Sequence, residues 1–209
     1  MVCVVCLLRS FNGGGIITMR WPLALTLAAA CLVASACGSS TGPSGSTGTL
    51  RMMLTDSPFT DAKSLFITFS EVDTHKSDTA EGAWSKVEFP NGATRTCDLK
   101  KLQTAQDVLG LGALPVGHYT QVRLVVRSAV IYFETAATGD ACGASLTAPP
   151  GRFANVTIPS GEVKLNREFD VSASTTTMMV LDFDGDKSVH ETGSLQYTMS
   201  PVIGVVSVQ

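Results

Sequence analysis

Apolar and polar residues alternate along most of the chain after Thr49. Leu50, Met52 and Leu54 alternate with Thr49, Arg51 and Thr55. Successive side chains of a β-strand point to opposite faces, so this period of two predicts strands with one buried face. Similar apolar runs or alternations occupy residues 65–69, 84–89, 122–126, 129–134, 155–158, 162–171, 175–183 and 196–208.

Turn residues separate these segments, as in Pro90-Asn91-Gly92 and Pro159-Ser160-Gly161. One segment, residues 99–111, instead has apolar residues at helical spacing. About eight short strands and so little helix predict an all-β fold. The strands should form two sheets packed face to face, because a lone sheet this apolar would expose its inner face. We expect an antiparallel two-sheet β-sandwich with at most one short helix.

The N-terminal segment has the order of an export signal. Residues 21–33 form an apolar run that follows Arg20 and precedes small residues. The run is too short for a transmembrane span, which needs about 20 apolar residues. We therefore predict a signal peptide over residues 1–36, with Met19 as the translation start because the signal features all follow it.

The predicted cleavage point falls at Cys37. The residues before it, Val33-Ala34-Ser35-Ala36, resemble the lipobox of bacterial lipoproteins, in which the cysteine thiol takes a diacylglycerol. Cys31 is a rival site, but cleavage there would shorten the apolar run to about the minimum for export. The alternative is an ordinary A-x-A cleavage that releases a soluble protein. We expect lipidation of Cys37.

Residues 37–48 then form a tether, because after Cys37 they contain only Gly, Ser, Thr and Pro. Residues 49–209 form the β-sandwich domain. The expected location is the cell envelope, and the outer membrane if the host has two membranes, because Gly38 rather than Asp follows the cysteine.

Composition and charge exclude one class of partner. With 44% apolar and 16% charged residues the chain can build a core. Removal of the signal takes Arg9 and Arg20 and leaves 13 basic against 18 acidic residues. No Lys/Arg cluster suited to phosphate neutralisation remains, so nucleic acid is not an expected partner.

Several stretches of the chain resemble one family. The stretches TLRMMLTDSP, LFITFSEVDTHK, LPVGHYTQVRL, LDFDGDKSV and YTMSPVIGVV are similar to the domain of unknown function 4382 family, found in bacterial lipoproteins and other exported proteins. The resemblance covers residues 49–206 and implies a sandwich of the transthyretin or immunoglobulin-like kind with no established activity. The insert around residues 140–143 is not part of the family pattern.

Two cysteines, Cys97 and Cys142, remain once the signal is removed and Cys37 is acylated. Both lie in polar, turn-rich surroundings, and an exported protein meets oxidising conditions, so we predict a disulfide between them. The alternative is two free thiols at opposite ends of the sandwich.

The clearest cluster of candidate ligands is acidic. Asp182, Asp184 and Asp186 alternate at a strand end, which would place three carboxylates on one face, with His190 and Glu191 nearby. One interpretation is a Ca²⁺ site, although the EF-hand spacing fails. The other is a polar turn in which the Asp side chains bond local backbone N–H groups.

Function is less readable than location. His75, His118 and His190 make no zinc motif. A sugar-stacking platform could form from four exposed-looking aromatics: Trp84, Tyr119, Tyr132 and Tyr197. We expect a non-enzymatic, lipid-anchored binding or structural module without a cofactor, whose partners are the membrane and an envelope glycan or protein. The alternative is a metal-dependent hydrolase or Ca²⁺-binding module built on residues 182–191.

Overall fold

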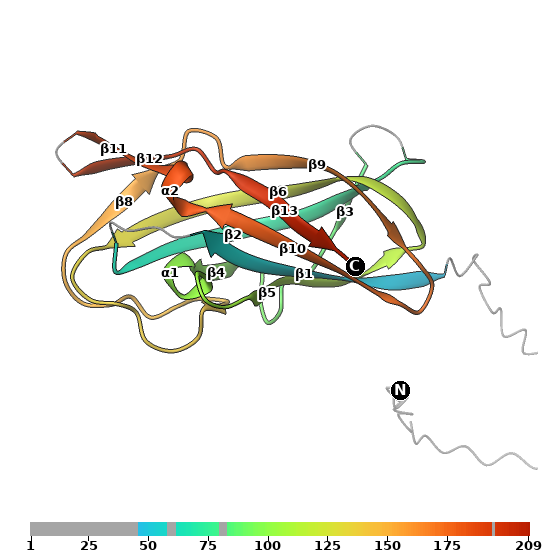
Figure 1. Ribbon diagram of the computed structural model, residues 1–209, viewed down its shortest axis with the longest axis horizontal. Helices are drawn as coiled ribbons and strands as arrows, with labels where there is room; N and C mark the ends of the chain where they lie inside the picture. The colour runs from blue at the N-terminus through green and yellow to red at the C-terminus, as the bar shows by residue number, and fades with distance from the viewer. Residues whose placement is uncertain (1–45, 58–61, 80–82, 194) are drawn as a thin grey trace, which may run out of the picture. The chain divides into compact units, whose positions relative to one another are not determined.

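The computed structural model describes residues 46–57, 62–79, 83–193 and 195–209 (Figure 1). The predicted signal, Cys37 and most of the tether lie outside the described residues. No helix in the described ranges is long and apolar enough to cross a membrane. The strands are β1 (Thr47–Ser57), β2 (Ser64–Lys76), β3 (Trp84–Lys86), β4 (Arg95–Asp98), β5 (Asp107–Pro115), β6 (Gly117–Tyr132), β7 (Cys142–Gly143), β8 (Phe153–Thr157), β9 (Glu162–Val171), β10 (Thr176–Asp184), β11 (Val189–Gly193), β12 (Gln196–Met199) and β13 (Ile203–Val208), and the helices are α1 (Leu99–Leu102) and α2 (Gly185–Ser188).

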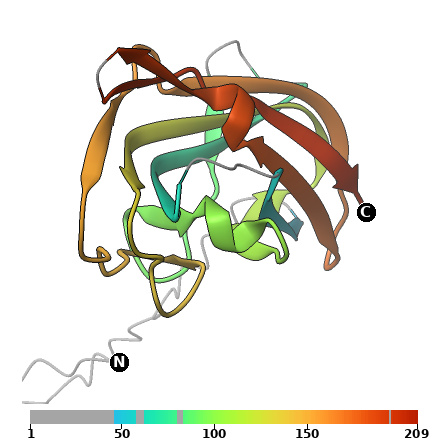
Figure 2. The same cartoon turned by 60° about the vertical axis from the view of Figure 1, so that its left-hand side comes forward.

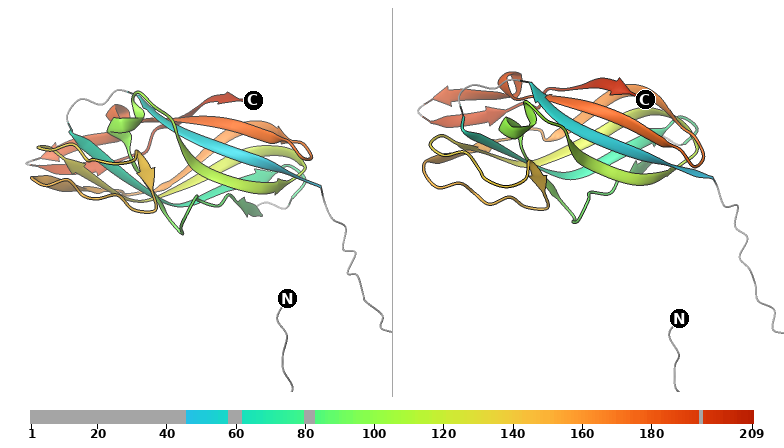
Figure 3. Two further views of the ribbon diagram at one scale, coloured as in Figure 1. Left: turned by 90° about the horizontal axis from the view of Figure 1, so that it is seen from below. Right: turned by 60° about the horizontal axis from the view of Figure 1, so that its bottom comes forward.

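The strands form two sheets that face each other (Figures 2 and 3). The smaller sheet has the order β13-β10-β1-β5. The larger has the order β11-β12-β8-β6-β2-β4-β7, with β3 also paired to β2 and β9 also paired to β6. This arrangement confirms the predicted all-β sandwich.

The sheets are mixed, so the expectation of purely antiparallel pairing was wrong at two places. Strand β10 runs parallel to β1, with Thr176 opposite Thr49. Strand β12 runs parallel to β8. Alternation within a strand specifies which face is buried but carries no information on the direction of the neighbouring strand. The sequence pattern therefore could not distinguish parallel from antiparallel pairing.

The core lies between the inner faces of the two sheets. In β1 the even-numbered residues from Gly48 to Asp56 are buried and the odd-numbered ones are more exposed, as the alternation predicts. Phe69 of β2 and Phe183 of β10 meet across the sandwich, with ring centroids 6.4 Å apart in an edge-to-face arrangement. The inward-facing residues predicted from the alternation thus pack against the opposite sheet.

The predicted helix over residues 99–111 is only partly present. Helix α1 ends at Leu102, and the strand β5 begins at Asp107 and pairs with β1. Gly110 in this segment and Gly112 just after it disfavour a helix, and Gly110 passes so close to Val87 that an added Cβ would lie 3.0 Å from the Val87 Cγ1 atom. A second helical turn, α2, occupies the predicted turn after Asp184, so the limit of one helix was also wrong.

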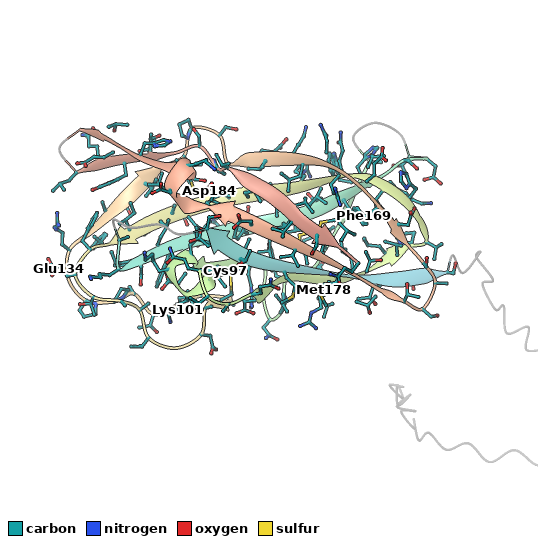
Figure 4. All side chains as sticks on the ribbon, viewed as in Figure 1. Cys97, Lys101, Glu134, Phe169, Met178 and Asp184 are labelled. Atoms are coloured by element: carbon teal, nitrogen blue, oxygen red, sulfur yellow. A yellow bond between two sulfur atoms is a disulfide. The ribbon has the colours of Figure 1, made fainter. Side chains whose placement is uncertain are left out.

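The predicted disulfide is confirmed. Cys97 of β4 lies opposite Cys142 of β7, and their sulfur atoms are bonded. Cys97 is fully buried and Cys142 nearly so. The bond attaches the long loop after β6 to the edge of the larger sheet, close to α1 (Figure 4).

Strand β6 runs from one end of the sandwich to the other (Figure 1). Just before β6 begins, Val116 N donates to Ser46 O at 2.9 Å, so the chain enters the domain here, and β1 starts at Thr47, two residues before the predicted boundary. Strand β8 pairs with the last four residues of β6, Ala129 to Tyr132. At about 3.3 Å per residue, the entry point and β8 are separated by roughly 40 to 50 Å.

Candidate ligand-binding groove

A groove opens at the end of the sandwich where β8 and β12 separate. The parallel pairing between these strands is limited to Val156 with Tyr197 and Thr157 with Thr198, whereas β8 begins three residues earlier, at Phe153. The resulting gap is a surface groove of about 650 Å³. Its lining residues are Phe133, Arg152, Phe153, Ala154, Asn155, Thr157, Thr192, Leu195, Gln196, Tyr197 and Thr198.

A second cavity of about 240 Å³ adjoins the groove. The two share four residues, Phe133, Arg152, Leu195 and Tyr197. The second cavity adds Ile131, Val189 and Glu191. The four shared residues therefore form a wall common to both cavities. Figure 4 labels Glu134, the neighbour of Phe133, at this same end of the molecule.

Aromatic rings gather around the groove. The rings of Phe133 and Tyr197 have centroids 5.6 Å apart, and those of Tyr132 and Phe153 lie 6.0 Å apart. Phe153 is 57% exposed and Leu195 is 53% exposed, although both are large and apolar. Apolar side chains that remain this accessible beside a concavity are typical of binding surfaces.

Arg152 is the basic residue of the groove. It follows Pro149-Pro150-Gly151, where Gly151 has φ +109° and an added Cβ would collide with Glu134. Arg152 O accepts from Phe133 N at 3.1 Å, which starts the pairing of β8 with β6. The guanidinium carbon then lies 4.6 Å from the centroid of the Phe133 ring, a cation–π stacking distance.

The sequence-predicted acidic cluster is not assembled as expected. Asp182 accepts from Ser57 Oγ at 2.6 Å. Asp184 caps α2, accepts from Lys187 N at 3.0 Å and pairs with Lys187 Nζ at 2.7 Å. These contacts with Lys187 lower the pKa of Asp184. Asp186 lies within α2, so the chain leaves the strand before the third carboxylate can share its face.

Within the described ranges, no three His, Cys, Asp or Glu side chains form a group suited to a metal ion. The contact from Lys187 N to Asp184 fits the interpretation of a polar turn. Glu191 accepts from the backbone N of Leu195 at 3.2 Å and borders the smaller cavity instead. The candidate histidines are apart: His118 pairs with Asp170 at 2.9 Å, His75 packs against Trp84, and His190 lies on the exposed side of β11.

The structure does not bring the four aromatics of the predicted platform together. Tyr119 is fully buried, stacks on Phe169 and donates its hydroxyl to Pro115 O at 2.8 Å, while Tyr132 is 8% exposed. Trp84 lies under Arg123, whose guanidinium carbon is 4.8 Å from the ring centroid. Of the four proposed aromatics, only Tyr197 lines the groove.

Sequence reasoning missed Arg152, Phe133 and Phe153. A strand was predicted over residues 155–158, but β8 begins earlier, at Phe153, and only Arg152 separates it from the turn signal Pro149-Pro150-Gly151. The partner strand β12, however, is distant in sequence and runs parallel to β8, so nothing local indicates the gap between them.

Sequence reasoning also missed a buried carboxyl group at the far end of β1. Asp56 is 5% exposed, and its Oδ1 atom accepts from Gly185 N at 3.2 Å. Burial raises the pKa of Asp56 to about 7, with a smaller contribution in the same direction from Asp182 and opposing hydrogen bonds from Gly185 and Gln103. The sequence did carry a sign of this, because Asp56 continues the inward series Leu50, Met52, Leu54.

These features define a disulfide-linked, all-β sandwich domain with a groove at one end. The chain belongs to the family described as Domain of unknown function (DUF4382), whose model matches residues 47–201. The match confirms the resemblance seen in the sequence and places the groove residues within the family domain. Neither the curated proteins nor the solved structures gave a match.

Proposed function

We propose that this protein is a non-enzymatic binding module of the cell envelope, anchored by lipid on Cys37, that presents its groove to a ligand away from the membrane. One observation carries the proposal. The chain enters the domain at Ser46, at the start of β6, whereas the groove lies beside the last residues of β6, roughly 40 to 50 Å away. A domain tethered through its N-terminus would therefore hold the groove on its distal side.

The construction of the groove supports binding rather than display of a flat surface. It is formed on strands of a sandwich with a fully buried core and a disulfide, so its walls are held by a rigid frame. Its volume of about 650 Å³ falls within the usual range for ligand sites. The outer membrane is the proposed location in a host with two membranes, since Gly38 follows the cysteine.

The anchor is tested by replacing its thiol. We expect Cys37→Ser to move the protein from the membrane fraction to the soluble fraction, because the single lipid-bearing residue is lost. Mass spectrometry of the wild type should find an acylated peptide that begins at Cys37. The matched control is Cys31→Ser at the rival site, which should leave membrane association unchanged. An unmodified Cys37 in a soluble product would contradict the anchor.

The groove is tested by crosslinking in living cells. We expect a photoreactive amino acid at Leu195 to yield adducts with envelope material, because this side chain lines both cavities and is 53% exposed. The control position is Val206 on β13, which is 63% exposed but lies outside the groove. Equal adduct yields at the two positions, or none at Leu195, would argue against the groove as a binding site.

A further inference from the structure

The groove presents one guanidinium that is held in place by stacking. Arg152 is exposed at the groove, and the Phe133 ring 4.6 Å beneath it restricts the plane of the guanidinium. In the described part of the chain, no Asp or Glu forms an ion pair with Arg152. A stacked guanidinium retains its in-plane N–H donors, which match the two oxygens of a carboxylate.

The charges around Arg152 favour a ligand with isolated negative groups. Among the residues that the structure describes, Arg152 is the one charged residue lining the larger cavity, and Glu191, in the smaller cavity, already accepts from Leu195 N. A single cation suits one carboxylate at a time. It does not suit a nucleic acid backbone, for which several phosphate contacts are needed.

The rest of the lining is suited to a sugar ring. Phe153 is 57% exposed, and an accessible phenyl face packs on the apolar C–H face of a pyranose. Around it lie the amides of Asn155 and Gln196 and the hydroxyl of Thr157, which can donate to and accept from sugar hydroxyl groups. The Thr198 hydroxyl donates to Thr157 O and can still accept from a sugar. Ring faces next to paired donors and acceptors match the amphipathic surface of a carbohydrate.

We propose, building on the proposed function, that the ligand of this groove is an acidic polysaccharide, and that a uronate carboxylate of the polymer binds Arg152 while the adjoining sugar ring packs on Phe153. The groove lies at the surface where β8 and β12 separate, so a sugar of a polymer can reach it from solvent. The assignment accounts together for the exposed Phe153, for an Arg152 guanidinium without an ion pair among the described residues, and for the polar part of the lining.

Calorimetric titration of the full chain in detergent micelles tests this assignment. The probes are a galacturonic acid oligomer of about five sugars, sized for a cavity of this class, and the galactose oligomer of the same length. We expect the acidic oligomer to bind and the neutral one to bind at least about tenfold more weakly, because the charge-assisted hydrogen bonds are lost. Arg152→Gln should weaken binding of the acidic oligomer by a similar factor, and Arg152→Lys by less, since the charge remains but the bidentate fork does not.

The controls separate the groove from general surface effects. Arg127→Gln makes the same chemical change at an exposed arginine of β6 outside the groove and should leave affinity unchanged. Phe153→Ala should weaken both oligomers, because ring packing does not depend on charge. Each variant is first checked for a wild-type unfolding midpoint.

Three results would overturn the assignment. They are equal binding of both oligomers, binding that is insensitive to Arg152→Gln, and binding of an acidic peptide with neither oligomer bound. The last result would leave the proposed binding module intact, as would adducts at Leu195 with a protein. Absence of adducts at Leu195 would instead contradict the proposed function itself.

Discussion

Replacement of both Cys97 and Cys142 with serine is expected to lower the free energy of unfolding of the domain by about 4 kcal/mol. The bond closes a loop with a sequence separation of 45, and removing it restores the conformational freedom of that loop in the unfolded chain. Serine at two buried positions adds a desolvation cost, so the loss is expected to be at least this large.

Urea unfolding of the wild type and the double variant measures this effect, with the midpoint and slope fitted for each. Because Cys97 is 0% exposed and Cys142 is 5% exposed, we expect a reductant without denaturant to leave the wild-type bond intact. Cys37→Ser is the control for loss of a cysteine outside the described domain. An unchanged midpoint in the double variant would show that the bond does not stabilise the fold.

A second large effect should appear as a dependence of stability on pH that traces to Asp56. Its pKa is about 7 in the folded protein, compared with the ordinary value of 3.8. The folded state therefore binds the proton more tightly than the unfolded state, and raising the pH favours unfolding. The penalty is absent below pH 3.8, grows as the pH rises between the two pKa values and is complete above about 7. At 1.36 kcal/mol per pKa unit its full size is about 4 kcal/mol.

Asp56→Asn isolates this contribution, because asparagine has nearly the same shape, carries no charge and retains an oxygen for Gly185 N. We expect the wild type to lose stability relative to Asp56→Asn as the pH is raised from 4 to 8, measured by urea unfolding at each pH. Asp186→Asn is the matched control, since it makes the same chemical change at an exposed residue. A constant difference between wild type and Asp56→Asn across this range would refute the role assigned to Asp56.

The fold was predictable in so far as it depends on alternation. Burial in β1 follows the pattern of Leu50, Met52 and Leu54 residue by residue, and the disulfide followed from the number of thiols left. Strand direction and the extent of each helix depend on partners distant in sequence. The chain over residues 107–111 has helical spacing, yet pairing with β1 makes it a strand, because tertiary contacts outweigh local propensity.

The site was less predictable than the fold for a related reason. Asp182, Asp184 and Asp186 are close in sequence, so the sequence pattern pointed to them. In the structure Ser57 donates to Asp182 and Lys187 pairs with Asp184, while Asp186 lies in α2 and not on the strand face. The groove is made by residues that are unremarkable one by one. Arg152 and Tyr197 acquire their roles only because β8 and β12 run parallel for two residue pairs and then separate.

The parallel pairing of β1 with β10 bears on when the domain can fold. Strand β1 is the first strand of the domain along the chain, yet it takes an interior place in its sheet, between β5 and β10. Thr49 of β1 can pair with Thr176 of β10 only after the long intervening segment of the chain has been made. Pairings between such distant residues form slowly because a long loop must close first. During synthesis, and during the export proposed above, β1 would therefore carry an unpaired edge until most of the domain has emerged, and in that interval a chaperone could bind this edge.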